Sequence, residues 1–270
     1  MHLRFTLSVL LNLCFFSTTI LAQTNFWADV PETEINVSQD DRLIIPEQYR
    51  TQRLDIVRLL LHLKNVPSEQ AFLSGTPGLA LELPLPDGNT AYFEVWEAPV
   101  MAPELTAKFP VIRSYAGKCR NYPGMLARFD LSPYGFHAML LNVGASAVFI
   151  DPYGRGNTID YICYYKKDFV KRTGDVFECQ LIQPVVIELP QGATDRAGDC
   201  GFRREYRLAL ACTGEYANFH GSFGSDKVPA LAAMNTTMNR VNGVFERDAS
   251  IRMVMVANNA NIVYTNPSTD

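Results

Sequence analysis

The sequence predicts an α+β protein in which a mostly β domain precedes a shorter β-α-β unit. From Asn25 to about Gln191, short strand-like runs alternate with turn sequences. The strongest helical pattern comes after them and lies between two apolar runs, Tyr206–Cys212 and Ile251–Ala257. Strands gathered first, with a helical unit afterwards, are typical of an α+β chain.

The first domain is expected to contain a hairpin and several further strands. Leu79–Leu83 and Tyr92–Trp96 flank the turn 86–89, in which Gly88 and Asn89 accept positive φ. Further strands are predicted at Val111–Tyr115, Met125–Phe129, Ala147–Ile150 and Asp160–Tyr165, with turns at 132–135 and 151–154.

Two helices are predicted among these strands, at Arg53–Lys64 and at Glu104–Phe109. In the first of them, Leu54, Val57 and Leu61 recur at spacings that place them on one face of the helix. That face is expected to pack against the strands.

The β-α-β unit begins with Tyr206–Cys212, which is mostly apolar and is predicted to be a buried strand. Ser225 or Asp226 can cap the helix that follows, and Pro229 lies in its first turn. Ile251–Ala257 is nearly all apolar, which is typical of an interior strand covered on both sides. The apolar face of the helix is expected to consist of Leu231, Met234, Met238, Val241 and Phe245.

The amino terminus predicts a secretory signal peptide over residues 1–22. His2 and Arg4 precede an apolar stretch from Phe5 to Leu21, and the small residue Ala22 follows. The stretch is too short for a membrane anchor, so the protein is expected to be secreted and free of the membrane once the signal is removed.

The rest of the chain is expected to form two domains, at residues 23–198 and 199–270. Residues 190–198 contain Gly, Pro, Thr and Asp between two structured parts, which is typical of a boundary. The formal net charge is −4 and no long basic run occurs, so nucleic-acid binding has no electrostatic support.

Three stretches of the second domain carry a resemblance to a known family. YRLALACTGEY, AMNTTMNRVNGVFERDASIRMVMVANN and IVYTN resemble the opening third of the catalytic domain in reprolysin-like zinc metallopeptidases, the adamalysin branch of the metzincins. Secreted bacterial relatives of this type are particularly similar. FDLSPYGFHAML, FIDPYG and YYKKDF resemble the amino-terminal region of those relatives, which implies that residues 23–198 are a propeptide-like domain.

The resemblance implies a zinc-dependent metalloendopeptidase zymogen that cleaves protein substrates. The family's zinc-binding helix, HExxHxxGxxH, is absent from the sequence. The four histidines, His2, His62, His137 and His220, also lack the spacing that places two imidazoles on one helical face. We therefore expect no catalytic residue, metal ligand or cofactor in this chain, which would be inactive and truncated before the zinc-binding helix. The alternatives are a non-catalytic secreted binding or inhibitory module, and a secreted β-rich surface protein.

Two sites are candidates for regulation in such a zymogen. Cys200 stands between the two domains, where metzincins often carry a cysteine-switch latch whose thiolate is the fourth ligand of the zinc. The alternative for Cys200 is a disulfide with Cys179, Cys212 or a residue outside this sequence. Arg203 and Arg204 form a candidate processing site, and the alternative is a solvated strand edge.

Other polar residues are assigned structural roles. Glu215, His220 and Asp226 lack the spacing of a metal or acid–base site and are expected to lie at the surface. His62 and His137 are expected to be hydrogen-bonded core or turn histidines. Leu208 occupies the position at which some adamalysins have a calcium-binding Glu, so no calcium site is expected there.

Overall fold

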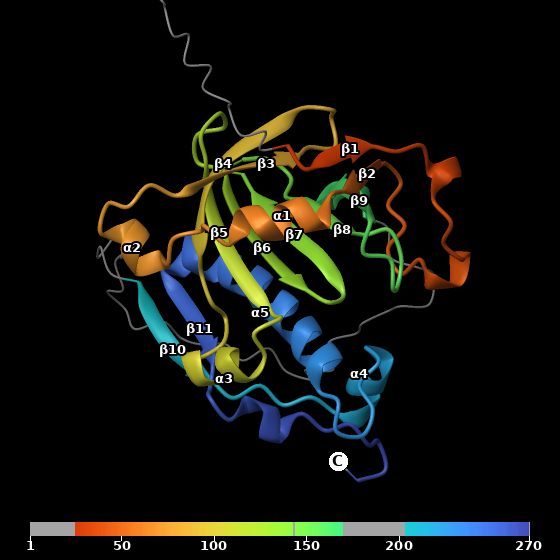
Figure 1. The fold of residues 1–270 in the computed structure, drawn as a ribbon, viewed down its shortest axis with the longest axis vertical. Helices are drawn as coiled ribbons and strands as arrows, with labels where there is room; N and C mark the ends of the chain where they lie inside the picture. Colours follow the sequence, from red (N-terminus) through yellow and green to blue (C-terminus); the bar gives the residue numbers. More distant parts are fainter. Residues whose placement is uncertain (1–24, 143, 170–202, 270) are drawn as a thin grey trace, which may run out of the picture.

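The computed structural model describes residues 25–142, 144–169 and 203–269 (Figure 1). Those residues form one antiparallel sheet of nine strands and a second sheet of two parallel strands, β10 and β11. The predicted signal peptide, the predicted domain boundary at 190–198, Cys179 and Cys200 lie outside the described residues.

The large sheet has the strand order β1-β2-β9-β8-β7-β6-β5-β4-β3. The seven consecutive strands β3 to β9 form a meander, and β9 also pairs with β2, which comes earlier in the chain. The strands are β1 (Trp27–Asp29), β2 (Arg50–Leu54), β3 (Leu79–Pro84), β4 (Thr90–Glu97), β5 (Arg113–Cys119), β6 (Leu126–Ser132), β7 (Gly135–Leu141), β8 (Val148–Pro152) and β9 (Asp160–Tyr165). The turn between β6 and β7 depends on Gly135, whose φ of 114° is readily accessible only to glycine.

Five α-helices accompany the strands in the described residues. They are α1 (Ile56–Leu63), α2 (Glu69–Leu73), α3 (Pro103–Lys108), α4 (Gly214–Phe219) and α5 (Val228–Ala249). Side chains cap three of them, since Asp55 accepts from the Arg58 N–H, Ser68 from the Ala71 N–H and Thr213 from the Tyr216 N–H.

The two faces of the large sheet pack against different helices. The strands curl around a core that α1 closes on one side, and α5 runs across the other side of β6 and β7 (Figure 1). The alternation along β6 explains this division: Phe129 lies in the core with Leu59 of α1, whereas Arg128 lies beneath α5, against Gly243. Polar residues on the second face of the sheet are therefore buried by α5.

The second sheet is a β-α-β unit, in which α5 connects β10 (Arg204–Leu208) to the parallel strand β11 (Ile251–Met255). Ser250 ends α5 in the left-handed conformation, with a φ of 53°. On its other edge β11 bonds to the segment before α3, since Met255 N–H donates to Val100 O and Ala102 N–H donates to Met255 O. The Asn242 side chain satisfies both backbone groups of Met253 from α5.

The α+β class with a mostly β first part agrees with the structure. The 79–96 hairpin, the strand at 160–165, the helix near 104–109 and the β-α-β order are confirmed, with small shifts at the ends. The strands β1, β2 and β7 and helix α2 were not expected. β7 was missed because its run of apolar residues shows no alternation: Phe136, Ala138 and Leu140 lie in the core, whereas Met139 and Leu141 lie towards α5.

Three local predictions are wrong. Leu54 belongs to β2, and Val57 and Leu61 are exposed, because Leu59 and Leu63 form the buried stripe of α1. β10 begins two residues earlier than predicted and is largely exposed rather than buried. In β11 only Arg252 and Met255 are buried, so β11 is not an interior strand covered on both sides.

The burial of α1 predicts unequal effects for two leucines on the same helix. We expect Leu59→Ala to lower the free energy of unfolding by about 2–5 kcal/mol, because a fully buried side chain leaves a cavity. Leu61→Ala removes the same atoms from a side chain that is 55% exposed, so its effect should stay within about 0.5 kcal/mol. Urea titrations of both variants measure the difference, and equal losses would contradict the observed face of α1.

Candidate functional site

A pocket of about 600 Å³ lies between the large sheet and helices α4 and α5. This volume is in the range that small-molecule and cofactor sites occupy. Its inner wall includes His137, Asp151, Thr236 and Arg240, and its remaining lining is formed by Leu43, Ile44, Ser132, Tyr134, Pro152, Gly154, Arg155, Gly156, Asn218, Phe219, His220, Gly221, Phe223, Pro229, Ala232, Ala233 and Thr237.

Three elements position the polar groups of the inner wall. His137 stands on β7 and Asp151 on the neighbouring strand β8, and the Nδ1 of His137 is 2.8 Å from an oxygen of Asp151. Arg240 reaches the same oxygen from α5, and Tyr164 O–H donates to the other oxygen at 3.0 Å. Asp151 is thus held by groups from β7, β9 and α5.

This arrangement stabilises the charge of Asp151. Burial by itself would raise the pKa of the carboxyl, but the Arg240 guanidinium and the His137 ring together hold that pKa well below its usual range. Desolvation by itself would lower the pKa of Arg240, but the charge of Asp151 outweighs it and raises that pKa. Both shifts favour the charged forms of Asp151 and Arg240, and so favour the ion pair.

Asp130 lies on β6 and is paired with His137 of β7 in the sheet register. Its environment raises its pKa, whereas that of Asp151 is lowered. Thr236 O–H donates to one oxygen at 2.6 Å and Asn239 N–H to the other at 3.4 Å, but no arginine bonds to it among the described residues. Desolvation raises the pKa of Asp130 despite the nearby charges of His137 and Arg240. The environments of these two buried carboxyl groups therefore shift their pKa values in opposite directions.

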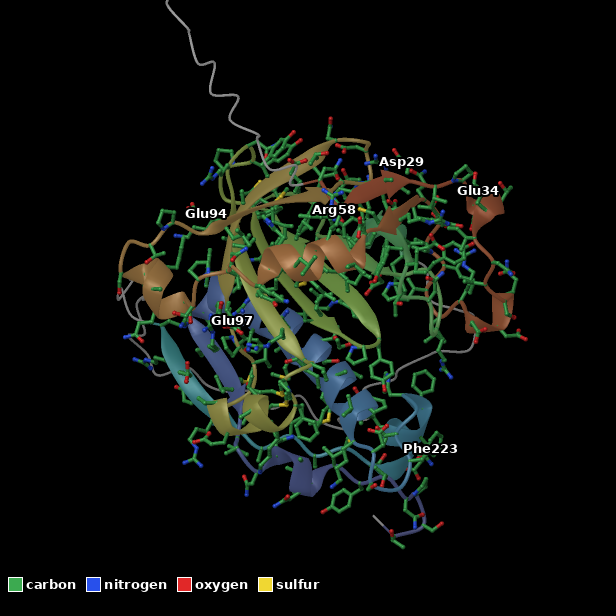
Figure 2. All side chains as sticks on the ribbon, viewed as in Figure 1. Asp29, Glu34, Arg58, Glu94, Glu97 and Phe223 are labelled. Carbon is green, nitrogen blue, oxygen red and sulfur yellow. The ribbon has the colours of Figure 1, made fainter. Side chains whose placement is uncertain are left out.

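The mouth of the pocket is aromatic and carries an arginine. The Arg155 guanidinium carbon lies 4.7 Å from the ring centroid of Phe219, and no carboxylate forms an ion pair with Arg155 in the described ranges. Phe219 and Phe223 are 52% and 62% exposed, and Phe223 lies beside α4 in Figure 2. Burial, followed by the charges of Arg155 and His137, lowers the pKa of His220.

The His137 and Asp151 pair has the orientation that a general base requires, but it lacks a nucleophile. No hydroxyl or thiol donates to His137 in the part of the chain that the structure describes. The pair therefore fits a structural or ligand-positioning role, which agrees with the expectation of a hydrogen-bonded histidine.

The described residues do not fit a zinc ion. No group of three or more His, Cys, Asp or Glu side chains that could hold a metal occurs among them. His62 on α1 bonds to the Ala80 carbonyl at 2.7 Å, His137 is engaged by Asp151, and His220 ends α4. These three histidines stand on separate elements with different partners.

A chain of five charged side chains connects the start of the β-α-β unit to α2 and β6. Arg203 donates to both oxygens of Glu69 at 2.8 and 3.0 Å, and Arg252 of β11 donates to the same carboxylate. Arg252 also bonds to Glu246 of α5, which in turn pairs with Arg128 of β6. Burial opposes the charge of Glu69, but the two arginines lower its pKa to about 2. Desolvation lowers the pKa of Arg128 to about 10.

The predicted site residues lie in different places. Cys200 lies outside the described residues, so both the latch and the disulfide stay predictions. Arg203 is held by Glu69, and Arg204 opens β10 in register with Ile251, so the candidate processing site is not a free loop. Glu215 and Asp226 are exposed as expected, whereas His220 is half-buried and lines the pocket.

Asp151, Arg155 and Arg240 were not predicted to be site residues. One signal could have found the buried polar face: Arg128 and Asp130 are charged residues two positions apart within an otherwise apolar strand. Such a pair on one face of a buried strand requires polar partners from another element.

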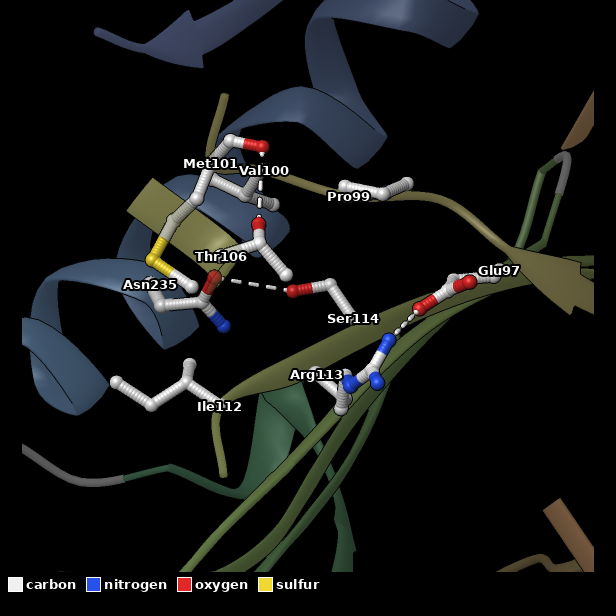
Figure 3. A pocket seen from close by; sticks show the side chains of 9 residues that line it. All are labelled: Glu97, Pro99, Val100, Met101, Thr106, Ile112, Arg113, Ser114 and Asn235. Carbon is white, nitrogen blue, oxygen red and sulfur yellow. Dashed lines mark hydrogen bonds and ion pairs between the residues drawn. The ribbon is translucent and has the colours of Figure 1, made fainter. Parts of the chain in front are cut away.

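A much smaller cavity of about 10 Å³ lies near Ser114 and Asn235, on the same side of the sheet (Figure 3). Ser114 O–H donates to the Asn235 side-chain oxygen at 3.0 Å, and the Asn235 side-chain nitrogen is buried without a partner. The space is of the order of one water molecule, so it cannot bind a substrate.

One comparison with known proteins gave a match. Residues 202–270 match the model of the metallo-peptidase family M12B, reprolysin-like. No curated protein and no solved structure matched the chain. Within the described residues, no helix has the length and apolar character needed to cross a bilayer.

The two carboxylates beneath α5 should respond differently to neutralisation. We expect Asp151→Asn to cost about 3–5 kcal/mol at pH 7, because Arg240 loses its counter-charge in a buried site. Asp130→Asn should cost no more than about 1 kcal/mol, or stabilise, because it removes a charge that burial disfavours. Urea titration of both variants at pH 7 measures these effects.

The two carboxyl groups should also give the stability opposite dependences on pH. The pKa of Asp151 is lowered in the folded protein. Its charge therefore contributes to the free energy of unfolding above the ordinary Asp value of 3.8, and this contribution is lost as the pH falls below that value. The pKa of Asp130 is raised in the folded protein, so Asp130 lowers the free energy of unfolding by an amount that grows as the pH rises from 3.8. The advantage of Asp130→Asn over wild type should therefore grow between pH 4 and pH 7, and a constant difference would contradict the assignment.

Glu69 is the residue through which Arg203 and Arg252 are joined. Glu69→Gln should lower the free energy of unfolding by about 1–3 kcal/mol at pH 7, since two guanidinium groups lose their shared carboxylate. The lowered pKa of about 2 means that the contribution is present above the ordinary Glu value of 4.5 and disappears as the pH falls from there towards 2. Glu205→Gln on exposed β10 is the matched control and should have little effect.

Proposed function

Because residues 202–270 are related to the M12B reprolysin-like metallopeptidases, we propose that this chain is the amino-terminal part of a secreted zinc-dependent metalloendopeptidase zymogen. Residues 23–198 would be its propeptide, and residues 199–270 would begin the catalytic domain. The substrates of such an enzyme are proteins. Removal of the signal peptide at residues 1–22 would release it from the membrane.

One observation carries the proposal: the residues that match the family also form a single structural unit. β10, α5 and β11 are a parallel β-α-β unit that spans most of the matched segment, as the resemblance implied for the start of the catalytic domain. A family relationship and a supersecondary unit that lies within the matched residues support each other.

The packing of α5 supports a propeptide that holds the catalytic part in place. The helix lies across β6 and β7, and its polar side chains pair with Asp130, Asp151 and Arg128 of the first domain. These contacts join the two proposed parts through buried charges, which lose much of their stabilisation when they separate.

The catalytic metal of the proposed enzyme would have to be held elsewhere. The family implies zinc for full-length members, but the described residues do not fit it. Cys200 remains a candidate latch for that metal centre, and Arg203 with Arg204 a candidate processing site. Cleavage there would require release of Arg203 from Glu69 and of β10 from β11, because a peptidase binds its substrate as an extended, accessible strand.

The chain by itself is expected to have no peptidase activity. We expect the purified chain, incubated with zinc and an unstructured protein such as casein, to release no more peptide than a sample treated with a chelator. Equilibrium dialysis should show no tightly bound zinc, since the described residues offer no ligand set. Hydrolysis that the chelator abolishes would overturn this assignment.

The coding sequence that follows the Asp270 codon tests the relationship to a full enzyme. An open frame that encodes HExxHxxGxxH, roughly a hundred residues after the β-α-β unit, would support the zymogen. A stop codon at this point in the gene would instead favour a binding or inhibitory module. Capture of an active relative by the purified chain, with loss on Cys200→Ala, would then support an inhibitory latch.

A further inference from the structure

The pocket between the large sheet and helices α4 and α5 has an unequal distribution of charge. Among the described residues that line it, the single carboxylate is that of Asp151, which already accepts from Arg240, His137 and Tyr164. The second lining arginine, Arg155, forms no ion pair within the described ranges. The lining of the pocket therefore has an excess of positive charge at neutral pH.

The free guanidinium lies at an aromatic mouth. Arg155 lies over Phe219, whose ring fixes one face of the guanidinium while its N–H groups remain able to donate. His220 is beside Phe219, with ring centroids 5.0 Å apart. The positive charge of Arg155 contributes to the lowered pKa of His220, which agrees with a positive potential at this end of the pocket.

The rest of the lining is largely apolar. Leu43, Ile44, Pro229 and Ala232 are among its residues, and Phe223 is exposed at the same mouth. An acidic group also lies nearby: the charge of Asp226 adds to burial in raising the pKa of the Tyr134 phenol. An anion would therefore be favoured at the Arg155 end and disfavoured beside Tyr134.

We propose that this pocket binds a carboxylate that carries an aromatic or large aliphatic group. The carboxylate pairs with Arg155 at the mouth, and the apolar group lies against Phe219 and the aliphatic lining. Arginine recognises carboxylates through two parallel N–H bonds, and stacking on an aromatic ring holds its plane in position for this. The argument for this site makes no use of the peptidase relationship, although Phe219, His220 and Arg240 belong to the segment that matches the family.

Isothermal titration calorimetry of the full chain with N-acetylphenylalanine tests the proposal. We expect saturable binding, and at least about tenfold weaker binding of N-acetylphenylalanine amide, because the amide removes only the charge. Arg155→Gln should weaken binding of the acid about tenfold without changing that of the amide. Arg120→Gln is the matched control, since Arg120 is exposed and lies outside the pocket lining.

A second probe distinguishes the source of the carboxylate. Comparable binding of the tripeptide Gly-Gly-Phe would assign the site to the carboxyl ends of peptides, whereas binding of N-acetylphenylalanine alone would assign it to small organic acids. Equal affinity for acid and amide, an unchanged affinity in Arg155→Gln, or no saturable heat up to millimolar concentrations would overturn the proposal. The acid and amide comparison in the unmodified chain needs no variant, so it holds even if a substitution disturbs folding.

Discussion

The pairing of buried charges beneath α5 is the constraint on which the arrangement of the chain depends. Arg128 and Asp151 point away from the main core into the contact with α5, where a charge is stable only with a partner. Glu246 and Arg240 of α5 supply these partners. Because the two pairs stand almost two helical turns apart, they fix the position of the helix along the sheet.

The same constraint shapes the pocket. Arg240 forms an ion pair with Asp151, so these two charges of the inner wall are already paired in the absence of a ligand. Arg155 at the mouth carries the charge that remains available, and Phe219 holds it. Within the part of the chain that the structure describes, Arg155 is thus a lining arginine without an ion pair, and the proposed ligand would pair with it without a large rearrangement.

The charged chain from Arg203 to Arg128 also links the proposed processing segment to the sheet. Arg203 shares Glu69 with Arg252, and Arg252 shares Glu246 with Arg128. A change at the start of β10 therefore alters the electrostatic environment of a buried arginine on β6.

The sequence by itself determined the class of the protein and the local elements whose signals are unambiguous. Turn residues around Gly88 located the first hairpin, and the regular apolar spacing from Leu231 located α5. The same sequence did not determine which stripe of α1 is buried, since Leu59 and Leu61 are equally apolar. Propensity and periodicity describe one element, whereas burial depends on what packs against it.

The candidate site forms only in the tertiary structure. Asp151 and Arg155 are near each other in sequence, but Arg240 is far from both along the chain, and no short motif relates the three residues. They line one pocket because β8 and the segment after it end beside α5, a contact set by strand order and by ion pairing. The relationship of residues 202–270 to a peptidase family was visible in the sequence, because contiguous residues carry it. The pocket could not be predicted, since its residues come together only when the sheet and the helix are packed.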